Sequence, residues 1–144
     1  MKTYYLYYDE TTNINYCFLF AIFCLTEYNK TEKLYNTVYY KSQKELAERI
    51  KKQCNYNISA ATISRILKDK NYLPYFTKST TENKITLNNN FKKGTAARNK
   101  FITLTEKEIL FLLEQDNKQL NKYYLYLKYY CGFSKNKKID TTAN

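Results

Sequence analysis

The apolar stretch YCFLFAIFCL, residues 16–25, most constrains how this chain can fold. With its flanks it predicts a helix over about 14–28, capped by Thr12 or Asn13 and apolar nearly all round. Neighbouring elements must cover such a helix on several sides. The run is far shorter than the ~20 apolar residues of a membrane span. The preceding YYDETTNIN is polar and acidic, unlike a signal peptide. We therefore expect a cytoplasmic protein with no membrane partner.

Length and charge limit the classes of partner. A chain of 144 residues, 44% of them hydrophobic, can form one compact domain or two small ones with a real core. The formal net charge of +11 favours an anionic partner: nucleic acid, an acidic membrane surface or an acidic protein. Lys, Asn, Ile and Tyr are abundant while Gly numbers only 2 and Pro 1, as AT-rich codons would produce. The charge is therefore supporting evidence rather than proof.

The chain lacks histidine, on which many catalytic and metal sites depend. Without histidine there is no Ser-His or Cys-His relay and no histidine metal centre. The four cysteines form no C-x-x-C pair, which argues against structural zinc and indicates buried thiols in a reducing cytoplasm. Two glycines cannot build a phosphate-binding loop, and the acidic residues are scattered along the chain. We expect no catalytic residue, no metal ligand and no cofactor.

Two consecutive amphipathic helices occupy the middle of the chain. SQKELAERIKKQC (42–54) begins with Ser42 and Glu45 at capping-box spacing. Its expected buried stripe is Leu46, Ala47 and Ile50. Its expected outer side carries Lys44, Glu48, Lys51 and Lys52.

The second helix is predicted over 60–69, with Ser59 as its N-cap. Its inward residues are Ile63, Ile66 and Leu67, and its outward residues are Ala60, Ala61, Ser64, Arg65 and Lys68. Two β-type runs follow, YLPYFTK and KITLN. The turn-prone STTEN between them predicts a hairpin.

The order of these elements is that of a winged helix-turn-helix: helix, brief strand (38–40), helix, turn, helix and hairpin. SQKELAERI followed by ISAATISRILKD resembles the helix-turn-helix of winged-helix DNA-binding proteins, with the pattern S-x-x-T-[IV]-S-R-x-L-K. The matching positions are Ser59, Thr62, Ile63, Ser64, Arg65, Leu67 and Lys68. The resemblance covers about 13–90. It implies a mainly α fold with a small β-hairpin (α+β).

The resemblance also implies a DNA-binding surface, because the second helix of the family enters the major groove by its N-terminal end. The residues expected there are Ser42, Lys44, Ser59, Ala61, Thr62, Ser64, Arg65, Lys68, Lys78 and Lys84. Arg65 suits a bidentate contact with guanine, and Lys78 and Lys84, which flank the hairpin tip, suit the sugar-phosphate backbone. The connection KKQCNYN is longer than the tight turn usual in regulators. Its length affects how the second helix can be placed against the bases of the DNA. The alternative is a plain surface helix with Arg65 and Lys68 solvated.

The remaining chain suggests a further segment. We expect a winged-helix domain over 1–90, a basic linker over 91–100 and a helical segment over 101–144. Thr105 and Glu108 have capping-box spacing. A helix over 117–133 should place Leu120, Tyr124, Leu127 and Cys131 on one side, with the tyrosines of 123–130 filling a core and any exposed ones available for dimerisation. The final DTTAN resembles the first turn of another helix, cut short.

Residues 100–130 resemble, more loosely, the bridge into a second winged helix in plasmid or phage replication initiators of low-GC Gram-positive bacteria. That resemblance implies binding of double-stranded DNA at repeated origin sites and recruitment of host replication proteins, without catalysis. Two alternatives stay open. One is a transcriptional regulator, dimeric through its C-terminal segment. The other is a winged-helix module that binds only protein.

Overall fold

The computed structural model describes residues 2–88 and 101–133, which form five α-helices and six β-strands. In chain order the elements are β1 (Thr3–Tyr7), α1 (Tyr16–Leu25), β2 (Glu27–Asn29), β3 (Leu34–Tyr39), α2 (Gln43–Cys54), α3 (Ala60–Leu67), the 3-10 turn η1 (Lys70–Tyr72), β4 (Phe76–Lys78), β5 (Lys84–Leu87), β6 (Phe101–Thr105), α4 (Glu106–Gln115) and α5 (Lys118–Phe133). The α+β class is confirmed. The prediction of a mainly α fold with one small β-hairpin understates the β structure, because the strands form a four-stranded and a two-stranded sheet.

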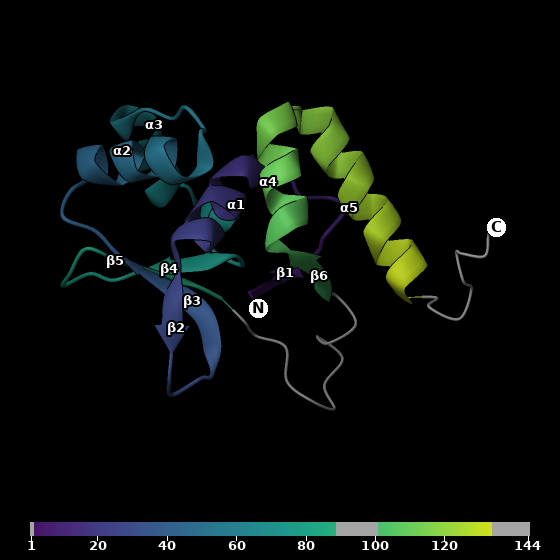
Figure 1. The fold of residues 1–144 in the computed structure, drawn as a ribbon, viewed down its shortest axis with the longest axis horizontal. Coiled ribbons are helices and arrows are strands. Elements are labelled where there is room, and N and C mark those ends of the chain that lie inside the picture. The colour runs from purple at the N-terminus through teal and green to yellow at the C-terminus, as the bar shows by residue number, and fades with distance from the viewer. Residues whose placement is uncertain (1, 89–100, 134–144) are drawn as a thin grey trace.

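Helix α1 is the centre of the molecule. Figure 1 shows it between α2 and α3 on one side and α4 and α5 on the other. Every residue from Tyr16 to Phe23 is buried, as expected for a helix that is apolar nearly all round. The helix is shorter than predicted because its cap is Asn15, whose side chain accepts a hydrogen bond from the Cys17 amide, and because Thr26 is extended.

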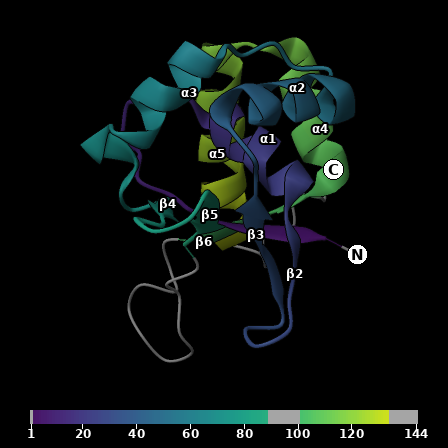
Figure 2. The same ribbon diagram turned by 90° about the vertical axis from the view of Figure 1, so that its left-hand side faces the viewer.

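A four-stranded antiparallel sheet with strand order β2-β3-β5-β4 lies below α1, α2 and α3, as Figures 1 and 2 show. Buried side chains from its strands include Val38, Phe76, Ile85 and Leu87. Residues 38 and 39 of the strand predicted at 38–40 are the end of the longer β3. The segment before them forms the β2–β3 hairpin, which the sequence did not predict.

A second, two-stranded sheet joins the two ends of the described chain. Strand β1 pairs with β6 in antiparallel register, with Tyr4 opposite Leu104 and Leu6 opposite Ile102. These four side chains are buried, and Ile109 of α4 and Leu125 of α5 belong to the same hydrophobic core. The C-terminal elements thus share one core with residues 2–88. The predicted linker over 91–100 lies outside the described residues, and the proposed division into domains stays a prediction.

Helix α5 buries its predicted side only in part: Leu120 and Tyr124 are half-buried against the core. Asn121 and Leu125 are buried, whereas Leu127 and Cys131 are exposed. The tyrosines do not fill a core as a group. Tyr124 and Tyr129 are half-buried, but Tyr123, Tyr126 and Tyr130 are exposed.

No helix within the described part of the chain is long and apolar enough to cross a membrane. The longest apolar helix, α1, would extend only about 15 Å, half the thickness of a bilayer core. Residues 2–88 and 101–133 also contain no group of three Cys, Asp or Glu side chains that could hold a metal ion.

Candidate nucleic-acid interface

Helix α3 is positioned by its first residues. The Ser59 hydroxyl oxygen accepts a hydrogen bond from the Thr62 amide at 3.1 Å, so the predicted N-cap is confirmed. The same hydroxyl donates to Thr62 Oγ1 at 3.0 Å. Ser59 is therefore engaged within the helix. The Thr62 hydroxyl, which receives that bond, keeps its own hydrogen to donate.

The opposite sides of α3 separate into core and solvent as predicted. Ile63 and Ile66 are buried, and Leu67 is half-buried against the core. Ala61, Arg65 and Lys68 are exposed, with Ser64 half-buried between them. Positions 61, 64, 65 and 68 follow the i, i+3, i+4, i+7 spacing of a single helical face. We call Ala61, Ser64, Arg65 and Lys68 the α3 face.

The charged groups of the α3 face are available to a ligand. Within the described ranges, neither the Arg65 guanidinium nor the Lys68 ammonium makes a hydrogen bond or an ion pair. An unengaged guanidinium offers a planar set of donors that fits guanine or phosphate.

The start of α2 carries two further predicted residues. The Ser42 side chain accepts from the Glu45 amide at 3.1 Å, so Ser42 is the cap. A capping box also requires the Glu45 carboxylate to accept from the Ser42 amide, and this part of the prediction is wrong. The Glu45 carboxylate accepts instead from the amide of Lys41, one residue before the cap, at 3.1 Å. Lys44 is exposed in the first turn of the helix.

The two predicted lysines of the β4–β5 hairpin differ in role. Lys78 Nζ donates to the carbonyl oxygens of Ser79 at 2.8 Å and Glu82 at 3.4 Å, so it holds the turn together. Lys84 Nζ lies 5.6 Å from the ring centroid of Tyr39, its cross-strand partner on β3. Lys84 thus carries its charge beside an exposed side chain, because Tyr39 is 47% exposed.

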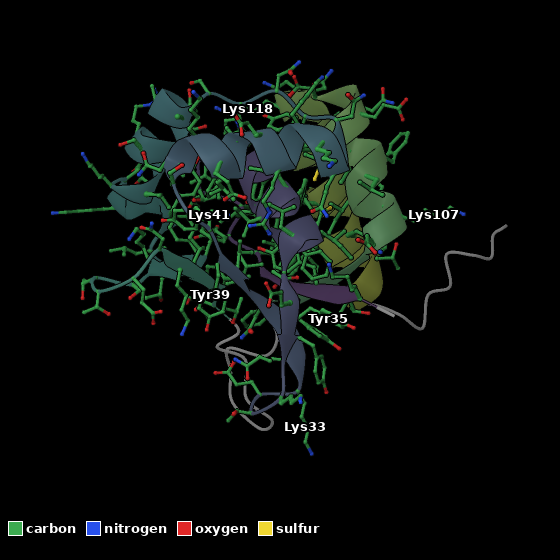
Figure 3. All side chains as sticks on the ribbon, turned by 60° about the vertical axis from the view of Figure 1, so that its left-hand side comes forward. Lys33, Tyr35, Tyr39, Lys41, Lys107 and Lys118 are labelled. Atoms are coloured by element: carbon green, nitrogen blue, oxygen red, sulfur yellow. The ribbon has the colours of Figure 1, made fainter. Side chains whose placement is uncertain are left out.

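The hairpin turn is attached to the start of α2. The Tyr40 amide donates to the Asn83 carbonyl at 3.1 Å, and Asn83 Nδ2 donates to the Lys41 carbonyl at 2.9 Å. Figure 3 shows Tyr39 and Lys41 on one side of the molecule and Lys107 of α4 on the other. The structure therefore brings Ser42 and Lys84 close together at the start of α2, and α3 packs against α2.

The connection between α2 and α3 has a defined form. Helix α2 ends at Cys54, and Asn55 adopts φ 53°, with its amide donating to the Lys51 carbonyl at 3.0 Å. Tyr56 then enters the core, and burial raises the pKa of its phenol well above the ordinary value. Residues 55–59 are thus anchored at Asn55 and Tyr56. The first four residues of KKQCNYN, 51–54, belong to α2, so the connection to α3 is shorter than that stretch suggested.

The expected site omitted Tyr39 and Lys41, both exposed beside the hairpin. A recognisable signal was present for Tyr39, because adjacent residues of a strand point to opposite faces and the apolar Val38 before it lies in the core. Lys41 had no such signal, since its position depends on the long-range bond from Asn83.

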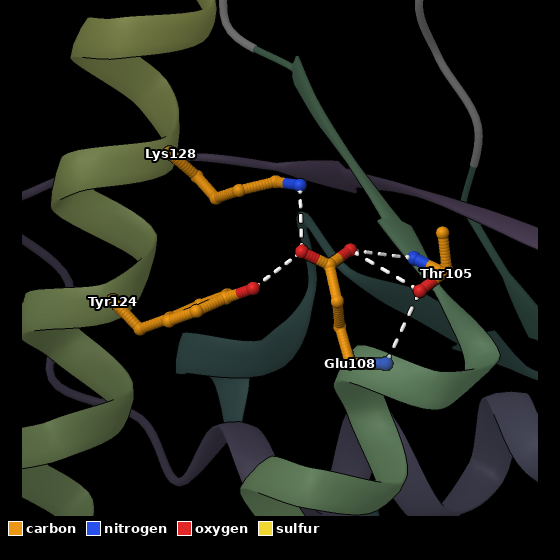
Figure 4. A network of polar contacts seen from close by, with 4 residues as sticks. All are labelled: Thr105, Glu108, Tyr124 and Lys128. Carbon is orange, nitrogen blue, oxygen red and sulfur yellow. Dashed lines mark hydrogen bonds and ion pairs between the residues drawn. The ribbon is translucent and has the colours of Figure 1, made fainter. Parts of the chain in front are cut away.

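A second polar cluster ties α4 to α5, far from α3 along the chain (Figure 4). The Glu108 carboxylate accepts from Lys128 Nζ at 2.8 Å, from the Tyr124 hydroxyl and from the Thr105 amide at 2.9 Å. The capping box predicted for Thr105 and Glu108 is confirmed. Burial alone would raise the pKa of Glu108, but these hydrogen bonds outweigh it and hold that pKa below its usual value.

Comparison with protein-family models, with curated proteins and with solved structures gave no match for this chain.

Proposed function

We propose that residues 16–88 form a winged helix-turn-helix that binds double-stranded DNA. The α3 face is assigned to the major groove, and the β4–β5 hairpin is the wing. Ser42, Lys44 and Lys84 are assigned to the phosphate backbone. The biological role we propose is replication initiation of the plasmid or phage kind, in which the protein marks origin DNA for host replication proteins.

The order and pairing of the elements support the winged-helix assignment. Helix α1, strand β3, helices α2 and α3 and the β4–β5 hairpin follow one another, and β3 pairs with β5. The pairing places the wing beside the strand that leads into α2. The β2–β3 hairpin is an addition to the expected arrangement.

The single observation that carries the proposal is that the α3 face presents two exposed cations beside a small residue. A small residue, Ala61, stands one turn before Arg65 and two turns before Lys68, and neither cation makes a hydrogen bond or an ion pair within the described residues. A solvated helix face is the competing explanation, and it predicts no DNA affinity that depends on Arg65.

A transcriptional regulator is the second candidate, favoured by one observation. Tyr123, Tyr126 and Tyr130 are exposed along α5, as a dimer contact would require. Mass measurement in solution with and without DNA separates the two candidates: a regulator is dimeric before it meets a single palindromic site, whereas an initiator occupies repeated sites on origin DNA.

The proposal is tested by selecting duplexes from a random library and measuring affinity for a selected and a shuffled duplex. Arg65→Ala is expected to lose ~1–3 kcal/mol on the selected duplex and to blunt the preference over the shuffled one. Lys107→Ala removes one charge from α4 and should change neither value by more than about 0.5 kcal/mol. Equal losses from the two variants would exclude α3 as the reading helix.

A further inference from the structure

A groove runs along the outer side of α2, apart from the α3 face. It has a volume of about 450 Å³ and an apolar floor of Ala47, Ile58 and Ala60. Ala47 was predicted to be buried, but it is only half-buried, and so is Ile58. The groove exists because two alanine methyl groups cannot fill the space between the helix surface and the connection over 55–59.

The rim of the groove is cationic. Lys44, Lys51 and Lys52 line it with a single acid, Glu48. Lys51 Nζ donates to Asn55 Oδ1 at 3.1 Å, while the ammonium groups of Lys44 and Lys52 have no partner in residues 2–88 or 101–133. Lys44 and Lys51 are seven positions apart on one helix, a spacing of roughly 10 Å. The apolar floor therefore lies between two separated positive charges.

This combination identifies the kind of occupant. A phosphate backbone gains nothing from an apolar floor, whereas aliphatic side chains placed on it gain about 25 cal/mol per Å² of area removed from water. Amphipathic helices bind in grooves of this kind through apolar residues at i, i+3, i+4 and i+7. Carboxylates beside that apolar stripe would meet the unengaged lysines.

We propose that the α2 groove binds an acidic amphipathic helix of a partner protein, with the apolar stripe on Ala47, Ile58 and Ala60 and carboxylates at Lys44, Lys51 and Lys52. Only Lys44 is shared with the assigned DNA surface. The groove is thus a second site, and its occupancy does not depend on the α3 face.

The test is an amide NMR titration of the full chain with two synthetic helical peptides. One consists of leucine at i, i+3, i+4 and i+7 with glutamate elsewhere, and the other carries lysine in place of glutamate. The acidic peptide should shift the amides of Ala47, Ile58 and Ala60 to saturation, with a Kd of about 10–500 µM, in the range of transient contacts. The lysine peptide should leave them unmoved.

Variants make the assignment specific. Ala47→Glu fills the groove with a like charge, and Lys52→Glu removes an attraction on an exposed position; each should weaken the acidic peptide about tenfold. Glu48→Gln should strengthen it about twofold by removing the one repulsive charge. Glu114→Gln, the same change on the exposed outside of α4, should have no effect.

The proposal would be overturned by equal binding of both peptides, by shifts centred away from the groove, or by peptide affinity that neither Ala47→Glu nor Lys52→Glu changes. It would also be overturned if the acidic peptide did not bind at all and Lys52→Glu lost affinity for duplex DNA, a result that would assign the groove to DNA. Arg65→Ala should leave peptide binding unchanged. The groove and the DNA proposal therefore fail independently.

Discussion

At the scale of single residues, the start of α3 depends on one hydroxyl. Ser59 receives the Thr62 amide and donates to the Thr62 hydroxyl. It therefore satisfies one of the free amides of the first turn and orients the first side chain that can donate to DNA.

Ser59→Ala is expected to lower the free energy of unfolding by ~0.5–2 kcal/mol, because it removes the cap. Urea denaturation followed by circular dichroism measures the loss. Ser64→Ala is the matched control, since this serine is half-buried in the same helix and should change stability by less than about 0.5 kcal/mol. Equal losses from the two variants would show that the cap contributes nothing particular.

Local residue patterns predicted the caps at Ser42, Ser59 and Thr105 correctly because capping is a contact between neighbours in the chain. They failed where a side chain had more than one possible partner close by in the chain. Glu45 turns toward the Lys41 amide and Arg49, whose guanidinium also donates to the Tyr39 carbonyl at 2.8 Å. Residue spacing also gave no sign that Lys78 holds the turn, because its bond to the Ser79 carbonyl depends on the geometry of that turn.

At the scale of elements, the β4–β5 hairpin contains two lysines with different roles. Lys78 holds the turn together, and Lys84 is assigned to the DNA backbone. This division predicts opposite effects of the same substitution at Lys78 and Lys84.

Lys84→Ala should weaken binding to all duplexes alike and reduce the slope of log affinity against log salt by about 1. Lys78→Ala should instead cost ~0.5–1.5 kcal/mol of stability through the lost turn bonds, with a smaller effect on the salt slope. Affinity measured over a salt series, together with urea denaturation, separates the two. A larger slope change in Lys78→Ala would contradict the assignment.

The α4–α5 pair is held by the Glu108 cluster. Because the pKa of Glu108 is lowered in the folded state, its contribution to stability is fully present above the unfolded pKa, near 4.3, and is lost as pH falls through the lower folded value.

Glu108→Gln should therefore lower stability by about 1–2 kcal/mol at pH 7, and the difference from the wild type should shrink as the pH falls below about 4. Denaturation at pH 7, 5, 4 and 3 checks this, with Glu114→Gln as the control for loss of an exposed carboxylate. A deficit that stays constant with pH would mean that the carboxylate charge is not involved.

Elements with strong helical periodicity were predictable, and short strands were less so. The β2–β3 hairpin was missed because its turn is organised by Asn29 Oδ1, which accepts the amides of Thr31 and Glu32, within a segment that is polar overall. The exposed groove on α2 was missed because Ala47 has the spacing of a core residue.

At the scale of the whole molecule, the two ends of the described chain meet in the β1–β6 sheet, and α1 packs against both α2 and α4. No local pattern predicts a pairing between strands so distant in sequence, because its stability comes from the shared core rather than from propensity.

A shared core predicts cooperative unfolding. Leu104→Ala, at a fully buried position of β6, should cost ~2–5 kcal/mol and shift the far-ultraviolet and tyrosine-fluorescence transitions together. Separate transitions would instead indicate that the C-terminal elements form a unit of their own.

The central claim is that the α3 face meets duplex DNA, and amide NMR mapping of the full chain with a selected duplex tests it most directly. The largest shifts should fall on Ala61, Ser64, Arg65 and Lys68, with smaller ones at Ser42 and Lys84, and they should weaken as salt rises. Shifts confined to α4 and α5, or none at Arg65, would contradict it.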